Sequence, residues 1–251
     1  MINADNSSVP TSSSPVAALR YIFNSPNWIM NVVWMSLAAL SSGIFVGQIA
    51  ALGYGTELIQ RNAAFRRSES MDVDIDRLGD YISKGIWPYL VHLAIGFLFS
   101  ILLALPLAGI FVFGALGLGA AAGEAGIAFA PLFFIPIALA ISTVLSIASI
   151  PFILRSMVCQ DFLPAFDVGW ALEFVSKMFW EILVSGIIFG ILSMAILFAG
   201  LLLCGVGYFP ACGIVLAGAM HMLAQWYEIF LSRGGTPIPP SDSSIVEASI
   251  L

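Results

Sequence analysis

The chain has 251 residues, of which 60% are hydrophobic and only 10% are charged, and its formal net charge is −6. Soluble domains carry about 25% charged residues, and this sequence contains uninterrupted apolar runs of the length that spans a bilayer. These properties exclude an ordinary soluble domain, and the scarcity of clustered Lys and Arg excludes a nucleic-acid-binding surface. We therefore expect an all-α, polytopic transmembrane helical bundle whose partner is the lipid bilayer.

We expect a single integral membrane domain over residues 15–233. Three hairpin-like units at 15–62, 72–155 and 164–233 would supply about 5–6 membrane helices, and a short interfacial amphipathic helix would precede each unit. The polar, Ser-rich segment 1–14 and the Gly-, Pro- and Ser-rich segment 234–251 lack an apolar pattern. We predict that both are disordered tails.

The first unit begins with Ser14 and Pro15, a combination typical of a helix N-cap followed by Pro at the first helical position. Trp28 starts the apolar run and is a candidate interfacial anchor, because Trp prefers the headgroup zone. Two interpretations of residues 28–60 stay open. One is a hairpin that turns near 41–43, either spanning or re-entrant, and the other is a single tilted helix.

The second and third units open with the same phrase. Residues 80–91 read DYISKGIWPYLV, and residues 173–184 read EFVSKMFWEILV. The two stretches align position by position without a gap. In each copy an acidic residue precedes a Lys by four positions, a pair that stabilises a helix. We interpret the phrase as a short interfacial helix, a Trp anchor (Trp87 or Trp180) and a descent into the bilayer. We expect the two tryptophans to lie at equal depth.

Gly and Ala are dense in residues 106–131, which predicts either a kinked helix extension or a re-entrant turn buried in protein. Glu124 is the only charged residue near the predicted tip of this unit. A carboxylate at a hydrated tip is the ordinary interpretation. A lone carboxylate in a re-entrant loop is the functional one.

The positive charges lie in the segments that lead into or out of the apolar runs. They are Arg20, Arg61, Arg66, Arg67, Arg77, Lys84, Arg155, Lys177 and Arg233. If each unit crosses the membrane and returns, these charges all lie on one face, and the positive-inside rule makes that face cytoplasmic. We therefore expect a multi-pass protein of the cytoplasmic (inner) cell membrane with loops 62–82 and 156–177 in the cytoplasm.

Four polar residues in or near the apolar runs are candidate functional residues, because ionisable groups in a membrane are costly. They are His92, His221, Glu124 and Gln225. Each histidine lies close to a predicted cytoplasmic boundary, where a side chain reaches headgroups or a neighbouring helix, so we favour a structural role over a proton relay. The sequence has no P-loop, GxSxG or HExxH motif and no CxxC spacing. We therefore assign no catalytic, cofactor-binding or metal-binding residue and expect neither an enzyme nor a cofactor.

Several phrases resemble a prokaryotic membrane-protein family, the domain of unknown function DUF4013. They are NSPNW at 24–28, GY at 53–54, FDVGWALEF at 166–174 and the closing segment GLLLCGVGYFPACGIVLAGAMHMLAQWY at 200–227. The resemblance covers about residues 16–231. It implies an uncharacterised multi-pass protein of the cytoplasmic membrane and brings no site residue. The first hairpin has Ser41-Ser42-Gly43 where this family leads us to expect a Pro, which leaves the topology of that hairpin open.

Two classes of function are compatible with the sequence. The first is a non-catalytic membrane protein that organises or modulates membrane partners or lipids, supported by the amphipathic segments and by the absence of a dense polar cluster within the apolar runs. The second is a transporter or channel for a small solute or an ion, supported by the internal repetition. We favour the first. Whether the chain binds another membrane protein or a second copy of itself stays open.

Overall fold

The computed structural model describes residues 12–65, 71–203 and 205–239, with only the backbone for 63–65 and for much of 102–138. Every regular element in these ranges is helical, so the predicted all-α class is confirmed. Four stretches are long and apolar enough to cross a membrane, judged by length and composition. They are Ile75–Ile101, Leu139–Cys159, Val168–Leu202 and Tyr208–Ser232, and a shorter apolar stretch covers Trp28–Ile44.

The helices form two compact units, one made of Met1–Val91 with Pro151–Leu251 and the other of His92–Ile150. In chain order the α-helices are α1 (Pro15–Arg20), α2 (Trp28–Ser41), α3 (Val46–Phe65), α4 (Leu78–Cys159), α5 (Val168–Leu202) and α6 (Tyr208–Ser232). Short 3-10 helices cover Tyr21–Asn24, Ser42–Ile44, Ile75–Arg77 and Pro164–Phe166.

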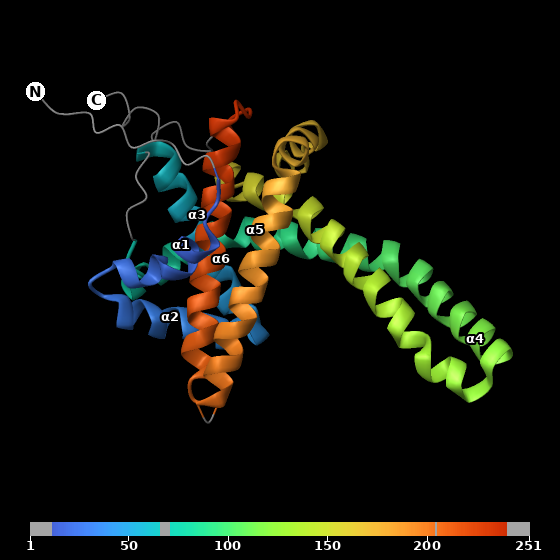
Figure 1. The fold of residues 1–251 in the computed structure, drawn as a ribbon. Helices are drawn as coiled ribbons and strands as arrows, with labels where there is room; N and C mark the ends of the chain where they lie inside the picture. The colour runs from blue at the N-terminus through green and yellow to red at the C-terminus, as the bar shows by residue number, and fades with distance from the viewer. Residues whose placement is uncertain (1–11, 66–70, 204, 240–251) are drawn as a thin grey trace, which may run out of the picture. The chain divides into compact units, whose positions relative to one another are not determined.

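Helix α6 is the centre of the first unit, where it contacts α1, α2, α3 and α5 (Figure 1). Small residues allow the close contacts. Gly213 lies against Ser36 of α2, and Gly218 lies against Leu19 of α1. Because glycine lets backbones approach closely, packing between apolar helices is tightest at such positions.

Residues 28–60 form two helices rather than one. A 3-10 turn covers Ser42–Ile44, and Phe45 takes a left-handed backbone conformation with φ 67° before α3 begins. The two helices contact each other, and a Cβ at Gly47 would overlap the carbonyl oxygen of Ala38. The structure therefore decides between the two open interpretations in favour of the hairpin.

Helix α4 reverses direction within its own length. A straight helix of its 82 residues would be about 123 Å long. Yet both of its ends contact the 20-residue α3. Gly85 lies against Ile49, and the Met157 carbonyl oxygen accepts a hydrogen bond from Gln60 at 3.1 Å. The chain must therefore turn back within the second unit, whose ribbon runs out and returns in Figure 1.

The backbone of residues 106–131 is helical, as the helix-extension interpretation predicts. The side chain of Glu124 lies outside the part of the chain that the structure describes. Its predicted role at a hydrated tip stays a prediction.

The three predicted anchors lie on the surface, with exposed fractions of 41% for Trp28, 38% for Trp87 and 73% for Trp180. Exposure is what a side chain that faces headgroups requires. The two copies of the repeated phrase nevertheless use their lysines differently. Lys177 binds Glu173 of its own helix at 2.9 Å, as predicted, whereas Lys84 binds a glutamate of α3.

The inner ends of both predicted tails pack against the helices. Ser13 donates to the Glu181 carboxylate from its backbone N–H and from its hydroxyl, at 2.7 Å each. The Trp170 indole N–H donates to the Thr236 carbonyl oxygen at 2.7 Å. The packed part of the chain thus reaches beyond 15–233 on both sides, and residues 1–11 and 240–251 lie outside the described residues.

Candidate functional site

The loop between α3 and α4 is held by polar residues at the start of α2. Asp72 accepts hydrogen bonds from the Ser25 hydroxyl, from the Asn27 amide at 2.9 Å and from the Asn31 amide at 3.0 Å. The Asn31 side-chain oxygen accepts in turn from the Val73 N–H at 2.9 Å. Because these bonds favour the ionised form, above all the one from Ser25 and next the one from Asn31, they lower the pKa of the Asp72 carboxyl from its ordinary value.

Two tyrosines hold the same loop from the interior. The Met71 N–H donates to the Tyr21 hydroxyl, and the Met71 carbonyl oxygen accepts from the Tyr54 hydroxyl, both at 2.8 Å. All three residues are buried. Both backbone groups of Met71 therefore have partners where this residue enters the interior.

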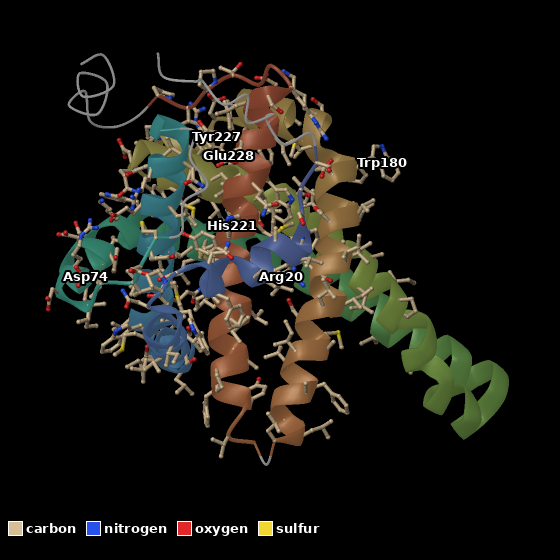
Figure 2. All side chains as sticks on the ribbon, turned by 60° about the vertical axis from the view of Figure 1, so that its left-hand side comes forward. Arg20, Asp74, Trp180, His221, Tyr227 and Glu228 are labelled. Atoms are coloured by element: carbon tan, nitrogen blue, oxygen red, sulfur yellow. The ribbon has the colours of Figure 1, made fainter. Side chains whose placement is uncertain are left out.

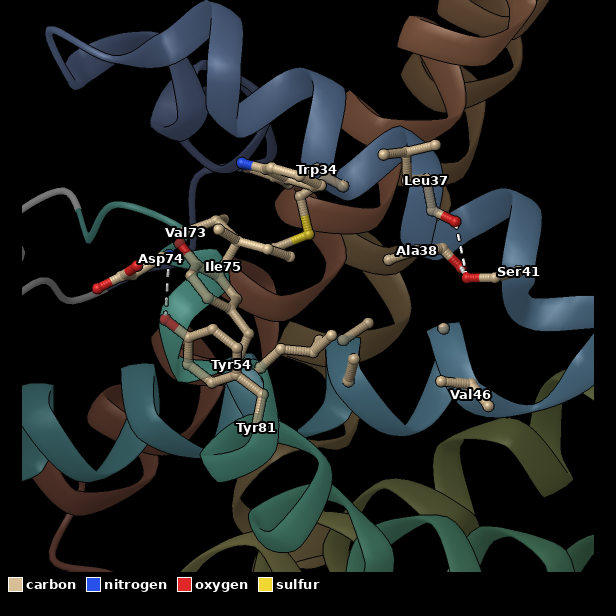
Figure 3. Close-up of a pocket in the computed structure, with 15 residues that line it drawn as sticks. Trp34, Leu37, Ala38, Ser41, Val46, Tyr54, Val73, Asp74, Ile75 and Tyr81 are labelled. Atoms are coloured by element: carbon tan, nitrogen blue, oxygen red, sulfur yellow. Dashed lines mark hydrogen bonds between the residues drawn. The ribbon is translucent and has the colours of Figure 1, made fainter.

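An apolar cavity of about 200 Å³ lies beside this loop, between α2, α3 and the start of α4 (Figure 3). The rings of Trp34, Tyr54 and Tyr81 line it together with aliphatic side chains such as Ile75 and Leu78. Figure 3 shows these side chains converging from separate elements. The cavity thus depends on the whole first hairpin and on the loop that follows it.

The hydroxyl groups of this lining already have partners within the protein. Tyr54 donates to the loop, as described above, and the Tyr81 hydroxyl accepts from the Asp74 N–H at 3.4 Å. The Ser41 hydroxyl donates to the Leu37 carbonyl oxygen at 2.7 Å. An occupant of the cavity would therefore meet mainly apolar surface, with Asp74 as the one charged residue of the described lining.

Two glycines allow α3 and α4 to pack closely against each other beside the cavity. A Cβ at Gly53 would overlap the carbonyl oxygen of Tyr81, and a Cβ at Gly85 would overlap the carbonyl oxygen of Ile49. The two backbones are thus in direct contact. Any larger residue at either position would push the helices apart and change the shape of the cavity.

An ion pair fixes the start of α4 on α3. Both oxygens of Glu57 accept from the Arg77 guanidinium, at 2.6 and 2.7 Å, and Lys84 adds a contact at 3.3 Å. The Glu57 side chain is only 15% exposed. A bidentate Arg–carboxylate pair fixes orientation as well as distance, so it complements the glycine contacts.

This arrangement suits part of an aliphatic chain. Its volume is below the ~300–1,000 Å³ of ordinary small-molecule sites, so a larger molecule would insert only one end. Within the described residues, no group of three or more His, Cys, Asp or Glu lies close enough together to hold a metal ion.

The structure brings two of the predicted polar candidates together, and neither lines this cavity. On α6 the His221 Nδ1 lies 2.9 Å from the Gln225 Nε2, and His221 is buried (Figure 2). The Gln225 oxygen accepts from the Ser14 N–H at 2.7 Å, and the ring centroids of His221 and Tyr21 are 4.2 Å apart. These contacts join α6 to α1, as a structural role would require. His92 is exposed on α4 and takes no part in them.

Sequence reasoning missed the residues that build the cavity. Nothing local singles out Asp72 or Trp34, because their neighbours in space are far away in the sequence. One signal did point here. The phrase NSPNW contains Ser25, which binds the loop, and the phrase GY contains both Gly53 and Tyr54.

The fold and the cavity define an all-α protein with helices of membrane length and an apolar, aromatic-lined hollow. The family model described as protein of unknown function (DUF4013) matches residues 36–205, which is more than half of the chain. The chain therefore belongs to the DUF4013 family, as its resemblance predicted. No curated protein and no solved structure matches it.

Proposed function

We propose that this chain is a non-catalytic, multi-pass protein of the cytoplasmic membrane that binds and organises lipids. In this arrangement α5 and α6 each cross the bilayer, α4 crosses twice, and α2 and α3 form a re-entrant hairpin. The 14 residues of α2 extend about 21 Å, which is too short for a hydrocarbon core of ~30 Å.

The observation that carries this proposal is the apolar cavity beside the loop. It is walled by Trp34, Tyr54 and Tyr81, and its hydroxyls are occupied by bonds within the protein. In a bilayer, the molecules that bring an aliphatic chain to such a space are the lipids.

The surface of α5 supports a lipid environment. Large apolar side chains are exposed along the helix, including Val184, Ile187, Ile191, Met194 and Phe198. Contiguous apolar patches of this kind are rare on soluble monomers and common where a protein meets a membrane. The face is therefore suited to direct contact with acyl chains.

A photoreactive phospholipid with a diazirine near the end of one acyl chain tests the proposal. The full-length protein would be placed in bilayer nanodiscs containing this lipid, irradiated and digested. Peptide mapping by mass spectrometry should then find label on the cavity residues Trp34, Tyr54 and Tyr81. Ala38→Leu, which places extra bulk in the cavity lining, should reduce this label severalfold.

Leu40→Phe is the matched control, because Leu40 lies on the same helix but is 54% exposed and faces outward. It should leave cavity labelling unchanged. Label at the exposed surface should be equal in both variants, since annular lipids reach it in every case. Cavity labelling that is absent, or equal in Ala38→Leu and the wild type, would contradict the proposal.

The transport alternative receives less support. A transport path needs polar groups near the middle of the bilayer. The lining of the described cavity is dominated by rings and aliphatic groups, and Asp74 is its only charged residue. The buried His221 contacts Gln225 of its own helix and the ring of Tyr21, which directly follows α1.

A further inference from the structure

A second hollow, distinct from the cavity beside the loop, runs between α1, α5 and α6. This groove has a volume of about 490 Å³ and lies within the first unit. Its α5 side is formed by Leu192, Ala195, Ile196 and Ala199. The small side chains of the two alanines leave the hollow open. Because all four of these residues are apolar, its floor is apolar.

One cation lines this groove. Arg20, the last residue of α1, contributes to the lining and is exposed to the surroundings. Figure 2 shows it on α1, lower in the view than Trp180. The α5 residues opposite lie about 18–28 Å beyond Trp180 along the helix. If Trp180 marks the interface, the positive charge of Arg20 therefore lies deeper than the positive-inside pattern of the sequence predicts.

Arg20 differs from the other described cations in its lack of a partner. Among residues 12–65, 71–203 and 205–239, the structure records no ion pair or side-chain hydrogen bond for Arg20. Arg61, unlike Arg20, takes part in an interaction. The other five described cations have carboxylate partners. These are Arg77 and Lys84 with Glu57, Arg155 with Asp167, Lys177 with Glu173 and Arg233 with Glu181.

A positive charge beside apolar surface in a membrane is costly unless an anion compensates it. The groove volume falls within the ~300–1,000 Å³ of ligand sites. A lipid with an anionic phosphate offers both features that this place lacks, a negative charge for Arg20 and an acyl chain for the groove. Arg is also well suited to phosphate, because its planar donors match the phosphate oxygens.

We propose that this groove holds an acyl chain of an anionic phospholipid whose phosphate pairs with Arg20. The inference rests on the proposed lipid-binding function and adds the class of lipid and the residue that selects it. Zwitterionic lipids would enter the groove less often, since their own cationic group competes with Arg20 for the phosphate.

The test uses the full-length protein in detergent, mixed with equimolar phosphatidylglycerol and phosphatidylcholine that carry identical oleoyl chains. The protein is recaptured and washed, and the retained lipids are quantified by mass spectrometry. The wild type should retain phosphatidylglycerol in preference to phosphatidylcholine by about fivefold or more. Arg20→Gln should bring this ratio close to the ratio supplied, and Arg20→Lys should keep part of it.

Two controls separate the site from general charge and from folding. Lys177→Gln removes the same charge at a position that lines neither the groove nor the cavity beside the loop, and it should keep the wild-type ratio. Thermal unfolding of Arg20→Gln should match that of the wild type, because the structure records no ion pair or side-chain hydrogen bond for Arg20. Ala199→Phe, which fills the groove while leaving Arg20 in place, should also abolish the preference.

Several outcomes would overturn the inference. They are a wild-type ratio equal to the ratio supplied, a wild-type ratio retained in Arg20→Gln, and an equal loss in Lys177→Gln. Displacement of the lipid by an equal amount of glycerol 3-phosphate would do the same, since it would identify a site for a soluble anion. The total lipid retained by the wild type reports on the proposed function instead. Retained lipid without preference would remove only the present inference, whereas no retained lipid would remove both.

Discussion

Among single residues, Asp72 has the largest number of recorded side-chain partners in the loop that walls the cavity. Its carboxylate receives hydrogen bonds from Ser25, Asn27 and Asn31. These donors lower the pKa of the carboxyl below the value of about 3.9 that an unfolded chain provides. A group with a lowered folded pKa stabilises the protein above the unfolded value, and this stabilisation is lost as the pH falls through the folded pKa.

We expect Asp72→Asn to reduce the free energy of unfolding by about 1 kcal/mol at neutral pH. This is less than the ~1.5–3 kcal/mol of hydrogen bonds to charged groups, because solvent screens the exposed Asp72. The difference from the wild type should narrow below about pH 4. Thermal unfolding in detergent, followed by tryptophan fluorescence across this pH range, measures both. Asp76→Asn removes the same charge from the same loop, and its side chain has no recorded bond, so it serves as the control. A difference that persists unchanged at low pH would contradict this account.

At the scale of elements, the two copies of the repeated phrase do not take equivalent places. Gly85, two residues before Trp87, packs on Ile49 of α3, and Gly55 of α3 lies against Met220 of α6. Glu181, next to Trp180, binds Arg233 just past the end of α6. Met220 and Arg233 are roughly 20 Å apart along a helix axis. If α6 stands across the bilayer, these contacts favour different depths rather than the equal depth that the repeat predicts.

We therefore expect lipids brominated deep in the acyl chain to quench Trp87 more than Trp180, and lipids brominated near the headgroup to do the reverse. Comparing the wild type with Trp87→Phe and with Trp180→Phe isolates the signal of each residue without disturbing the buried Trp170 and Trp226. Equal quenching profiles would restore the original expectation. They would then require α6 to be strongly tilted.

At the scale of the whole molecule, the polar contacts of α5 and α6 gather where α5 begins and α6 ends. Lys177 donates to the carbonyl oxygen of Gly234, Arg233 binds Glu181, and Arg155 binds Asp167. Val206, between the two helices at their other end, is 73% exposed in an apolar surround. This polarity distinguishes the two ends of the α5–α6 pair, and the cytoplasmic placement of loops 62–82 and 156–177 stays a prediction.

Single-cysteine labelling in a Cys-free background tests this topology. We expect a membrane-impermeant maleimide to label Val206→Cys in intact cells. Ser12→Cys and Asp161→Cys should react only after the membrane is permeabilised, because both lie on the predicted cytoplasmic side. Labelling of Ser12→Cys in intact cells would place the first helices the other way round and contradict the re-entrant hairpin.

The order of the amino acids alone predicts the all-α class, the membrane-length helices, the reversal of the chain between residues 72 and 155, and the family. Each of these predictions rests on a local property of the sequence. The properties are the length of an apolar run, a helix-capping residue and the order of residues in a short motif. The sequence leaves the first hairpin open because each arm barely spans a bilayer core and Ser41-Ser42-Gly43 has no Pro. The 3-10 turn at Ser42–Ile44 and the left-handed Phe45 decide for the hairpin.

The tertiary structure alone decided which helix faces meet. Asp72 and Asn31 are 41 residues apart, and Lys84 binds Glu57 on another helix rather than the acid of its own phrase. In a membrane protein the lipid-facing and protein-facing sides of a helix are both apolar, so no polarity pattern tells them apart. The cavity beside the loop and the groove at Arg20 both lie where such faces meet, and for this physical reason neither could be read from the sequence.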